Sequence, residues 1–154
     1  MSFAIDSLTE LELPEYTKVS ALSGVQYDYG YTQSDDGDFE GTDKNDYIVA
    51  SGKKDKIETK AGDDAVVNQG GKKKVVETGG GTDLYALDVS SIAKKGKTIL
   101  KDFQSGVDKV AIDGDGDVQV KGYGTKKLTI TSGNKKHTIK SKEDDFDRDD
   151  VEFI

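Results

Sequence analysis

Apolar side chains recur at intervals of nine residues through the middle of the chain. The interval holds over five positions and is followed by one interval of ten: Phe39, Ile48, Ile57, Val66, Val75 and Tyr85. A helix buries residues three and four apart, and a half-buried strand buries every second residue, so neither element explains a period of nine. The period predicts a stack of coils, each made of two nine-residue units. Each unit is a turn followed by a three-residue strand whose middle side chain points inward.

The composition is consistent with thin coils and narrows the possible functions. Only 33% of the 154 residues are hydrophobic, whereas glycine occurs 18 times and proline once. The net charge of −8 disfavours nucleic acid as a partner, because an acidic chain gains no affinity from a phosphate backbone. The chain has no cysteine, so disulfides and thiolate metal sites are excluded. No apolar run is long enough to span a membrane.

Several segments, in a consistent order, resemble one protein family. Residues 41–49, GTDKNDYIV, look like the nonapeptide of RTX (repeats-in-toxin, haemolysin-type) proteins. Residues 79–85 and 99–110, which include the motif DFxxGxDxV, resemble the end of the serralysin-type β-roll, and residues 128–130 and 137–139 resemble its closing hairpin. The resemblance covers roughly residues 36–154. It implies an all-β fold, a right-handed parallel β-roll with a C-terminal β-hairpin cap.

The resemblance also implies calcium (Ca²⁺) in the turns. In the family, turn glycines let carbonyl oxygens converge, an aspartate supplies a carboxylate, and the ion lies between turns of consecutive coils. The matching residues fall on one side of the roll. They are Asp46, Asp64 and, after a one-residue insertion, Asp83, with Asp43, Gly62 and Asp63 assisting. Lys44, Thr59 and Lys60 depart from the family pattern, so a calcium-free roll is the alternative.

The opposite side of the roll departs further from the family. Asp55 is followed eighteen residues later by Lys73. A lysine cannot ligate a metal ion, but its ammonium can pair with a carboxylate. The spacing therefore predicts that an Asp55–Lys73 contact replaces calcium on this side.

The ends of the chain are expected to cap the roll. We divide the sequence into an N-terminal arm or cap (1–35), the RTX-like β-roll (36–112) and C-terminal capping strands (113–154). Tyr27, Tyr29 and Tyr31 alternate with smaller residues, which would place three rings on one strand face. The N-terminal part either closes the end of the stack or docks on a partner. Residues 149–154, DDVEFI, are similar to the end of proteins exported by type I secretion, or form a final strand completing the hairpin.

Catalytic machinery is not evident in the sequence. His137 is the single histidine, and no HExxH motif occurs, so neither a zinc centre nor a Ser/His/Asp triad is expected. The favoured hypothesis is a non-enzymatic, calcium-binding structural or assembly module of an extracellular or surface protein. The alternative is a virion structural protein, a phage capsid decoration or cement protein. In either case a protein partner, or self-assembly through the N-terminal arm, is expected.

Overall fold

The computed structural model describes residues 2–5, 27–33, 35–114 and 116–154, and these residues are almost entirely strands and turns. The two helices among them are single turns of 3-10 helix, η2 (Val89–Ser91) and η3 (Arg148–Asp150). None of the described helices is long and apolar enough to cross a membrane.

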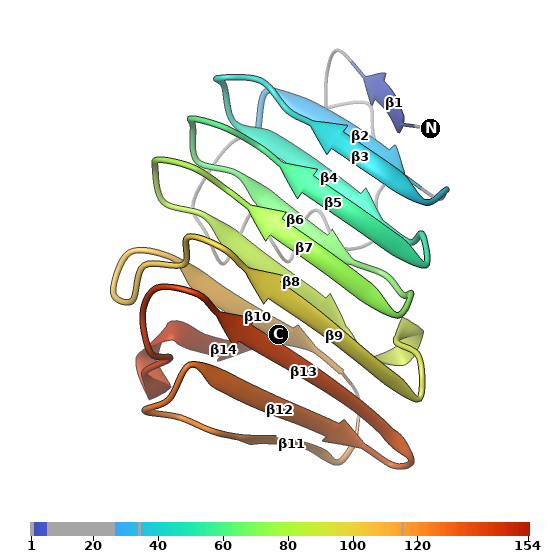
Figure 1. Ribbon diagram of the computed structural model, residues 1–154, viewed down its shortest axis with the longest axis vertical. Coiled ribbons are helices and arrows are strands. Elements are labelled where there is room, and N and C mark those ends of the chain that lie inside the picture. Colours follow the sequence, from blue (N-terminus) through green and yellow to red (C-terminus); the bar gives the residue numbers. More distant parts are fainter. Residues whose placement is uncertain (1, 6–26, 34, 115) are drawn as a thin grey trace.

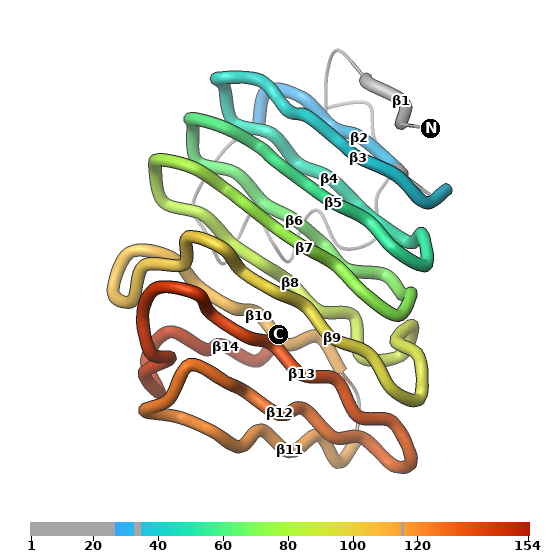
Figure 2. The backbone as a smooth tube through the Cα atoms, viewed as in Figure 1, coloured from blue at the N-terminus to red at the C-terminus, as the bar shows by residue number. Residues whose placement is uncertain are grey.

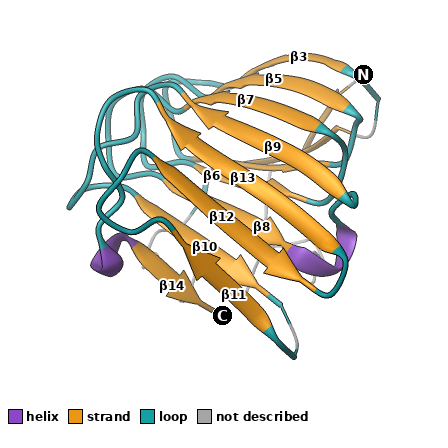
Figure 3. Cartoon of the chain, turned by 60° about the horizontal axis from the view of Figure 1, so that its bottom comes forward, coloured by secondary structure: helices purple, strands orange, loops and turns teal. Residues whose placement is uncertain are grey.

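The strands form two sheets that face each other, and successive strands from β2 to β10 alternate between them (Figure 1). Sheet A has the order β1 (Ser2–Ile5), β2 (Tyr29–Gln33), β4 (Asp46–Ala50), β6 (Ala65–Asn68), β8 (Leu84–Asp88), β10 (Lys109–Asp113) and β14 (Val151–Phe153). Sheet B has the order β11 (Val118–Lys121), β12 (Lys127–Ser132), β13 (Lys135–Ser141), β9 (Lys95–Leu100), β7 (Lys73–Glu77), β5 (Lys54–Glu58) and β3 (Gly37–Glu40), as Figure 3 shows.

Pairing between consecutive coils is parallel, which confirms the predicted β-roll. Phe39 pairs with Ile57 and Ile48 with Val66, a coil length of eighteen residues. Further along, the coils lengthen: Val66 pairs with Tyr85, nineteen residues on, and Tyr85 with Val110, twenty-five residues on. The tube in Figure 2 shows the turns of successive coils lying above one another on both sides.

One rung of the predicted ladder is wrong by a residue. Ile57 pairs with Val76 rather than Val75, so the inserted residue lies in the turn at 69–72 and not after Val75. Val76 is 1% exposed and belongs to the core, whereas Val75 is half-buried on the outer face of sheet B. The two adjacent valines made both registers compatible with the nine-residue period.

The main core fills the space between the sheets. It contains the inward residues of every coil, among them Phe39, Ile48, Ile57, Val66 and Val76. The strands are longer than the predicted three residues, and β4 and β6 are buried at every position. Their outward residues join a second apolar cluster on the outer face of sheet A, which includes Tyr47, Val49, Ala65, Val67, Leu84, Ala86 and Ala111.

The ends of the roll agree only partly with expectation. The predicted hairpin is present as the antiparallel pair β12–β13, which follows β9 in sheet B. The final strand β14 does not complete that hairpin: it pairs with β10 in sheet A. At the other end, β1 lies antiparallel to β2. Residues 6–26 of the predicted N-terminal arm or cap lie outside the described residues.

The three N-terminal tyrosines do not share one face, contrary to expectation. Tyr31 is in the core between the sheets, with its ring 4.8 Å from that of Phe39, and Tyr29 packs against the same cluster. Tyr27 precedes the strand and lies in the outer cluster, 5.5 Å from the ring of Tyr47. Strand alternation therefore does not extend back to Tyr27.

The two sides of the roll carry different turns. The turns at 41–45, 59–64, 78–83 and 101–108 lead from sheet B into sheet A, and we call this the aspartate side. The turns at 51–53, 69–72 and 89–94 lead from sheet A into sheet B, and we call this the lysine side.

Candidate metal centre

Four aspartates are stacked on the aspartate side, each at the point where a turn enters a strand of sheet A. The carboxylates of the last three each accept a hydrogen bond from the backbone N–H of the aspartate one coil earlier, whereas that of Asp46 accepts from Thr42. Asp64 Oδ1 accepts from Asp46 at 2.8 Å, Asp83 Oδ1 from Asp64 at 2.9 Å, and Asp108 Oδ1 from Asp83 at 2.9 Å. We call this set, Asp46, Asp64, Asp83 and Asp108, the aspartate ladder.

The aspartate ladder is buried and lacks a counter-charge among the described residues. Its members are between 0% and 4% exposed, and no described lysine or arginine forms an ion pair with any of them. The Oδ2 atoms of Asp64 and Asp83 have no hydrogen-bond partner in the described part of the chain. Buried oxygens of this kind are costly unless a proton or a cation satisfies them.

Burial perturbs the titration of all four carboxyls. It raises the pKa of Asp64 to about 8, with the neighbouring charges of Asp83 and Asp46 adding to the effect. It likewise raises the pKa of Asp83 to about 8, with the charges of Asp108 and Asp102 contributing. Burial also raises the pKa of Asp46 and of Asp108. Near neutral pH, the metal-free ladder therefore holds protons that a bound cation would displace.

The glycine turns beside the ladder bring the backbones of consecutive coils into close contact. Gly62 has φ +109°, and a Cβ there would overlap the carbonyl oxygen of Lys44 in the preceding coil. One coil later, a Cβ at Gly81 would overlap the carbonyl oxygen of Gly62. Only glycine permits this approach. The turns that precede the ladder aspartates are thus packed directly against one another from coil to coil.

A second row of polar side chains ties the same turns together. Asn45 Oδ1 accepts from the backbone N–H of Asp63 at 2.8 Å, and Asp63 Oδ1 accepts from that of Thr82 at 2.8 Å. The predicted ligand Asp63 therefore has a role in holding the coils in register. Asp43, by contrast, is exposed at the tip of its turn, and the structure gives it no contact with the ladder.

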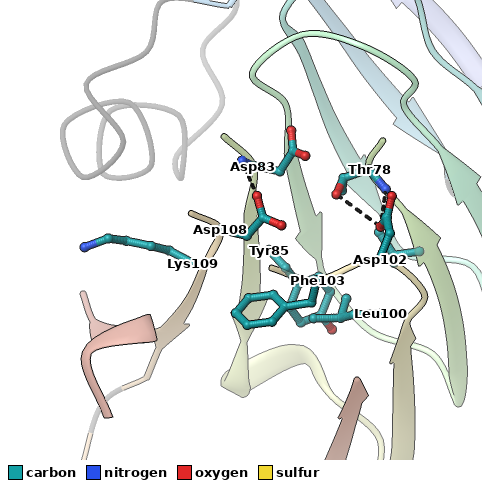
Figure 4. Close-up of a pocket in the computed structure, with 9 residues that line it drawn as sticks. Thr78, Asp83, Tyr85, Leu100, Asp102, Phe103, Asp108 and Lys109 are labelled. Atoms are coloured by element: carbon teal, nitrogen blue, oxygen red, sulfur yellow. Dashed lines mark hydrogen bonds between the residues drawn. The ribbon is translucent and has the colours of Figure 1, made fainter. Parts of the chain in front are cut away.

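A small cavity opens at the C-terminal end of the ladder (Figure 4). Asp83, Asp102 and Asp108 line it together with Thr78 and Phe103, and its volume is about 10 Å³, close to the size of one water or one ion. Asp102 caps the preceding turn by accepting from the backbone N–H groups of Thr78 at 3.0 Å and of Gly79 at 2.6 Å.

The sequence analysis missed Asp108 as a member of this site. The signal was available, because Asp108 precedes the core residue Val110 by two positions, as Asp83 precedes Tyr85. Asp108 follows Asp83 by 25 residues, because the connecting turn at 101–108 makes this coil longer. A search for aspartates eighteen or nineteen residues apart therefore does not find it.

Comparison with known proteins identifies the architecture. No model of a known protein family matches the sequence, and no curated protein matches it significantly. Among solved structures, the solution structure of the AlgE6R3 subunit from the Azotobacter vinelandii mannuronan C5-epimerase is similar. The TM-score is 0.54 at 16% sequence identity, with 77% of this chain and 78% of that chain covered. The two proteins share a fold, which in this chain is the parallel β-roll. At this level of identity the likeness shows the fold alone, and the ligand of this β-roll must be argued from its own residues.

The donor set of the β-roll fits calcium only if backbone oxygens take part. In the described part of the chain, no three histidine, cysteine, aspartate or glutamate side chains converge on one point at metal-binding distance. Calcium accepts six to eight oxygens and tolerates carbonyl ligands, whereas zinc and other transition metals need convergent side chains. The free Oδ2 atoms of Asp64 and Asp83 are hard oxygen donors, and together with carbonyl oxygens of the neighbouring turns they would suit calcium best.

On the lysine side, the structure corrects the predicted pair. Asp55 lies beside Lys74 rather than Lys73, because the inserted residue at 69–72 shifts the register. The distance from Lys74 Nζ to Asp55 Oδ2 is 2.9 Å, and both side chains are almost fully buried. Lys73 belongs to the outer face of sheet B. The expectation of a lysine–carboxylate contact is thus met by the neighbouring residue.

The single histidine of the β-roll lies in a buried polar chain. Asn68 donates to the hydroxyl of Tyr85, which hydrogen bonds to Thr98, and the Thr98 hydroxyl is 2.8 Å from His137 Nε2. His137 is 1% exposed. Burial lowers its pKa to about 4, with the charge of Lys74 contributing, so the imidazole is neutral near pH 7. This imidazole is placed to support the core rather than to meet a substrate.

Proposed function

We propose that this chain is a non-enzymatic structural module that binds calcium along the aspartate side of its β-roll. The observation that carries the proposal is the buried, uncompensated aspartate ladder, with Oδ2 of Asp64 and of Asp83 unsatisfied. Asp46, Asp64, Asp83 and Asp108 would supply carboxylate oxygens, and Gly62 and its neighbours would supply carbonyl oxygens.

Calcium would act by linkage. A cation that binds between folded coils, and not to the unfolded chain, stabilises the fold by RT ln(1 + [Ca²⁺]/Kd). Extracellular calcium modules bind in the range of roughly 10⁻⁴ to 10⁻³ M. We therefore propose an extracellular setting, in which millimolar calcium completes folding that low cytosolic calcium does not support. A capsid decoration protein is the alternative, and purified virions that contain this chain would establish it.

Thermal unfolding with calcium and with chelator tests the proposal. At free calcium about 100 times Kd, the stabilisation is about 2.7 kcal/mol, or a rise in Tm of roughly 5–10 °C. The double variant Asp64→Asn/Asp83→Asn should melt at a higher temperature than the wild type in chelator, because folding no longer requires two buried carboxyls to take up protons, and should show no calcium shift. Asp38→Asn, which changes an exposed carboxylate on β3, is the matched control and should retain the shift. A wild-type Tm that does not change with calcium contradicts the proposal.

A further inference from the structure

The ammonium of Lys74 occupies an enclosed position between two turns of the lysine side. Lys74 Nζ donates to the carbonyl oxygens of Gly52 and Gly70, both at 2.6 Å, and lies 2.9 Å from Asp55 Oδ2. Lys74 as a whole is 1% exposed. Two of the three N–H donors of the ammonium are used by the carbonyl oxygens, and the Asp55 carboxylate forms an ion pair with the ammonium.

The surroundings of this ammonium are built like a cation site. The two carbonyl oxygens come from turns one coil apart, 51–53 and 69–72, and the carboxylate comes from the strand between them in the chain. Gly71, with φ +94°, makes the arrangement possible. A Cβ there would overlap the carbonyl oxygen of Gly52 and would lie 2.8 Å from Lys74 Nζ. On the aspartate side, the turn at Gly62 likewise packs against the preceding coil, and the stacked Asp64 follows it in the chain.

The charge on the two sides of the roll differs in one respect. On the aspartate side, Asp64 and Asp83 remain without a described counter-charge and hold protons. On the lysine side, Asp55 has a cation in contact. A metal ion could therefore contact Asp55 at this position only by displacing the ammonium of Lys74.

We propose that this position is a cation site of the roll that is permanently filled by a tethered cation, the ammonium of Lys74. Two consequences follow. The lysine side is stable without calcium, and removal of the ammonium while Asp55 is kept opens a site for a free cation, either an alkylammonium ion or calcium. The inference stands on the contacts of Lys74 and does not depend on calcium binding at the aspartate ladder.

Cation rescue of a Lys74 variant tests this inference. The experiment uses the Asp64→Asn/Asp83→Asn background, so that calcium binding at the aspartate ladder does not contribute. In this background, Lys74→Ala should lower Tm by roughly 10 °C, because it removes the ammonium that contacts the buried carboxylate of Asp55. Methylammonium chloride or calcium chloride should restore at least half of the loss, relative to choline chloride at equal ionic strength. Lys73→Ala, on the adjacent outward position, should show neither the loss nor the rescue.

The same titrations on a second variant test whether the Asp55 carboxylate is the group that binds the added cation. Lys74→Ala/Asp55→Asn should lose the cation response, because the carboxylate is gone. A response that persists in this variant, or the absence of any rescue in Lys74→Ala, overturns the inference. If Lys74→Ala does not fold in any buffer, Lys74→Gln, which keeps the length and an N–H₂ donor, takes its place in both titrations.

A measurement on the wild-type protein is independent of variant folding. During a calcium titration followed by ¹H–¹⁵N NMR, the amide signals of Gly52, Gly70 and Gly71 should stay in place. Movement of these three signals together, with loss of the hydrogen-bonded ammonium signal of Lys74, would show that calcium displaces the lysine and would overturn the inference.

Discussion

At the scale of single residues, the buried charges of this roll are handled in two different ways. Lys74 meets Asp55 directly, whereas Asp64 and Asp83 are left with raised pKa values. Both arrangements place charge at the edges of a narrow core, where a small error in position leaves a group unsatisfied. The register of each strand therefore matters more here than in a roll lined by apolar residues alone.

Substitutions of Val75 and Val76 test the register of β7. Val76→Ala removes two methyl groups from a fully buried site and should lower the free energy of unfolding by about 1.5–3 kcal/mol. Val75→Ala, the matched change on the outer face of sheet B, should alter it by less than about 0.5 kcal/mol. Urea unfolding of both variants in the same buffer measures the difference. Equal effects, or a larger effect at Val75, would favour the register predicted from sequence.

At the scale of strands and turns, the period of nine was sufficient to predict the stacked coils, because the inward positions of β3, β4, β5 and β6 repeat without interruption. It was not sufficient beyond Val66, where the turns vary in length. A glycine pair at Gly70 and Gly71 accommodates an extra residue without a change in the apolar pattern, so the pattern alone cannot locate the insertion.

The candidate site was predictable to the same extent. Asp46, Asp64 and Asp83 follow the period and were identified, and the structure stacks them. Asp108 was missed because the turn at 101–108 lengthens its coil. Asp43 is exposed at the tip of its turn, and its part in metal binding stays a prediction. The role of the stacked aspartates as calcium ligands also stays a prediction.

The turn at Gly62 provides a test at this scale. Gly62→Ala forces a side chain into a left-handed conformation and against the carbonyl oxygen of Lys44, so we expect a loss of at least about 1–3 kcal/mol in unfolding free energy. Gly80→Ala is the control in the next coil, because Gly80 is exposed and a Cβ there meets no atom within 4 Å. It should change stability by less than about 0.5 kcal/mol. If Gly62→Ala and Gly80→Ala have the same unfolding free energy, the close stacking of the turns is contradicted.

At the scale of the whole molecule, stability should depend on pH in opposite ways with and without calcium. The pKa of Asp64 and of Asp83 rises on folding from 3.8 to about 8, so the metal-free folded state binds more protons than the unfolded state between these values. Stability from these groups therefore falls as pH rises from about 4 to about 8. The pKa of His137 falls on folding from 6.5 to about 4, so its contribution is present above pH 6.5 and is lost as pH falls toward 4.

Measurements between pH 6.5 and 8 separate these effects, because His137 is then largely neutral in both states. The calcium-free protein should lose stability across this window, and the Asp64→Asn/Asp83→Asn variant should lose less. Chemical denaturation at fixed ionic strength gives the slope. A wild-type stability that rises with pH in this window would contradict the raised pKa values.

Calcium uptake should release protons for the same reason. At pH 7, up to two protons should leave Asp64 and Asp83 as the ion binds, and calcium affinity should increase with pH. Isothermal titration calorimetry in two buffers of different ionisation enthalpy counts the protons. Calcium binding that is independent of buffer would place the ion away from these two carboxyls.

The pairing of β14 with β10 has a consequence for how the molecule is made. Sheet A is completed by a strand that lies more than thirty residues beyond its neighbour, after sheet B has turned back through β11, β12 and β13. During vectorial synthesis or export, the edge of β10 that pairs with β14 therefore stays unpaired until residue 153 has emerged. Pairing of β14 with β10 is therefore a late step in folding. A chain that ends a few residues early would leave β10 as an unpaired edge, with which a strand of another chain could pair.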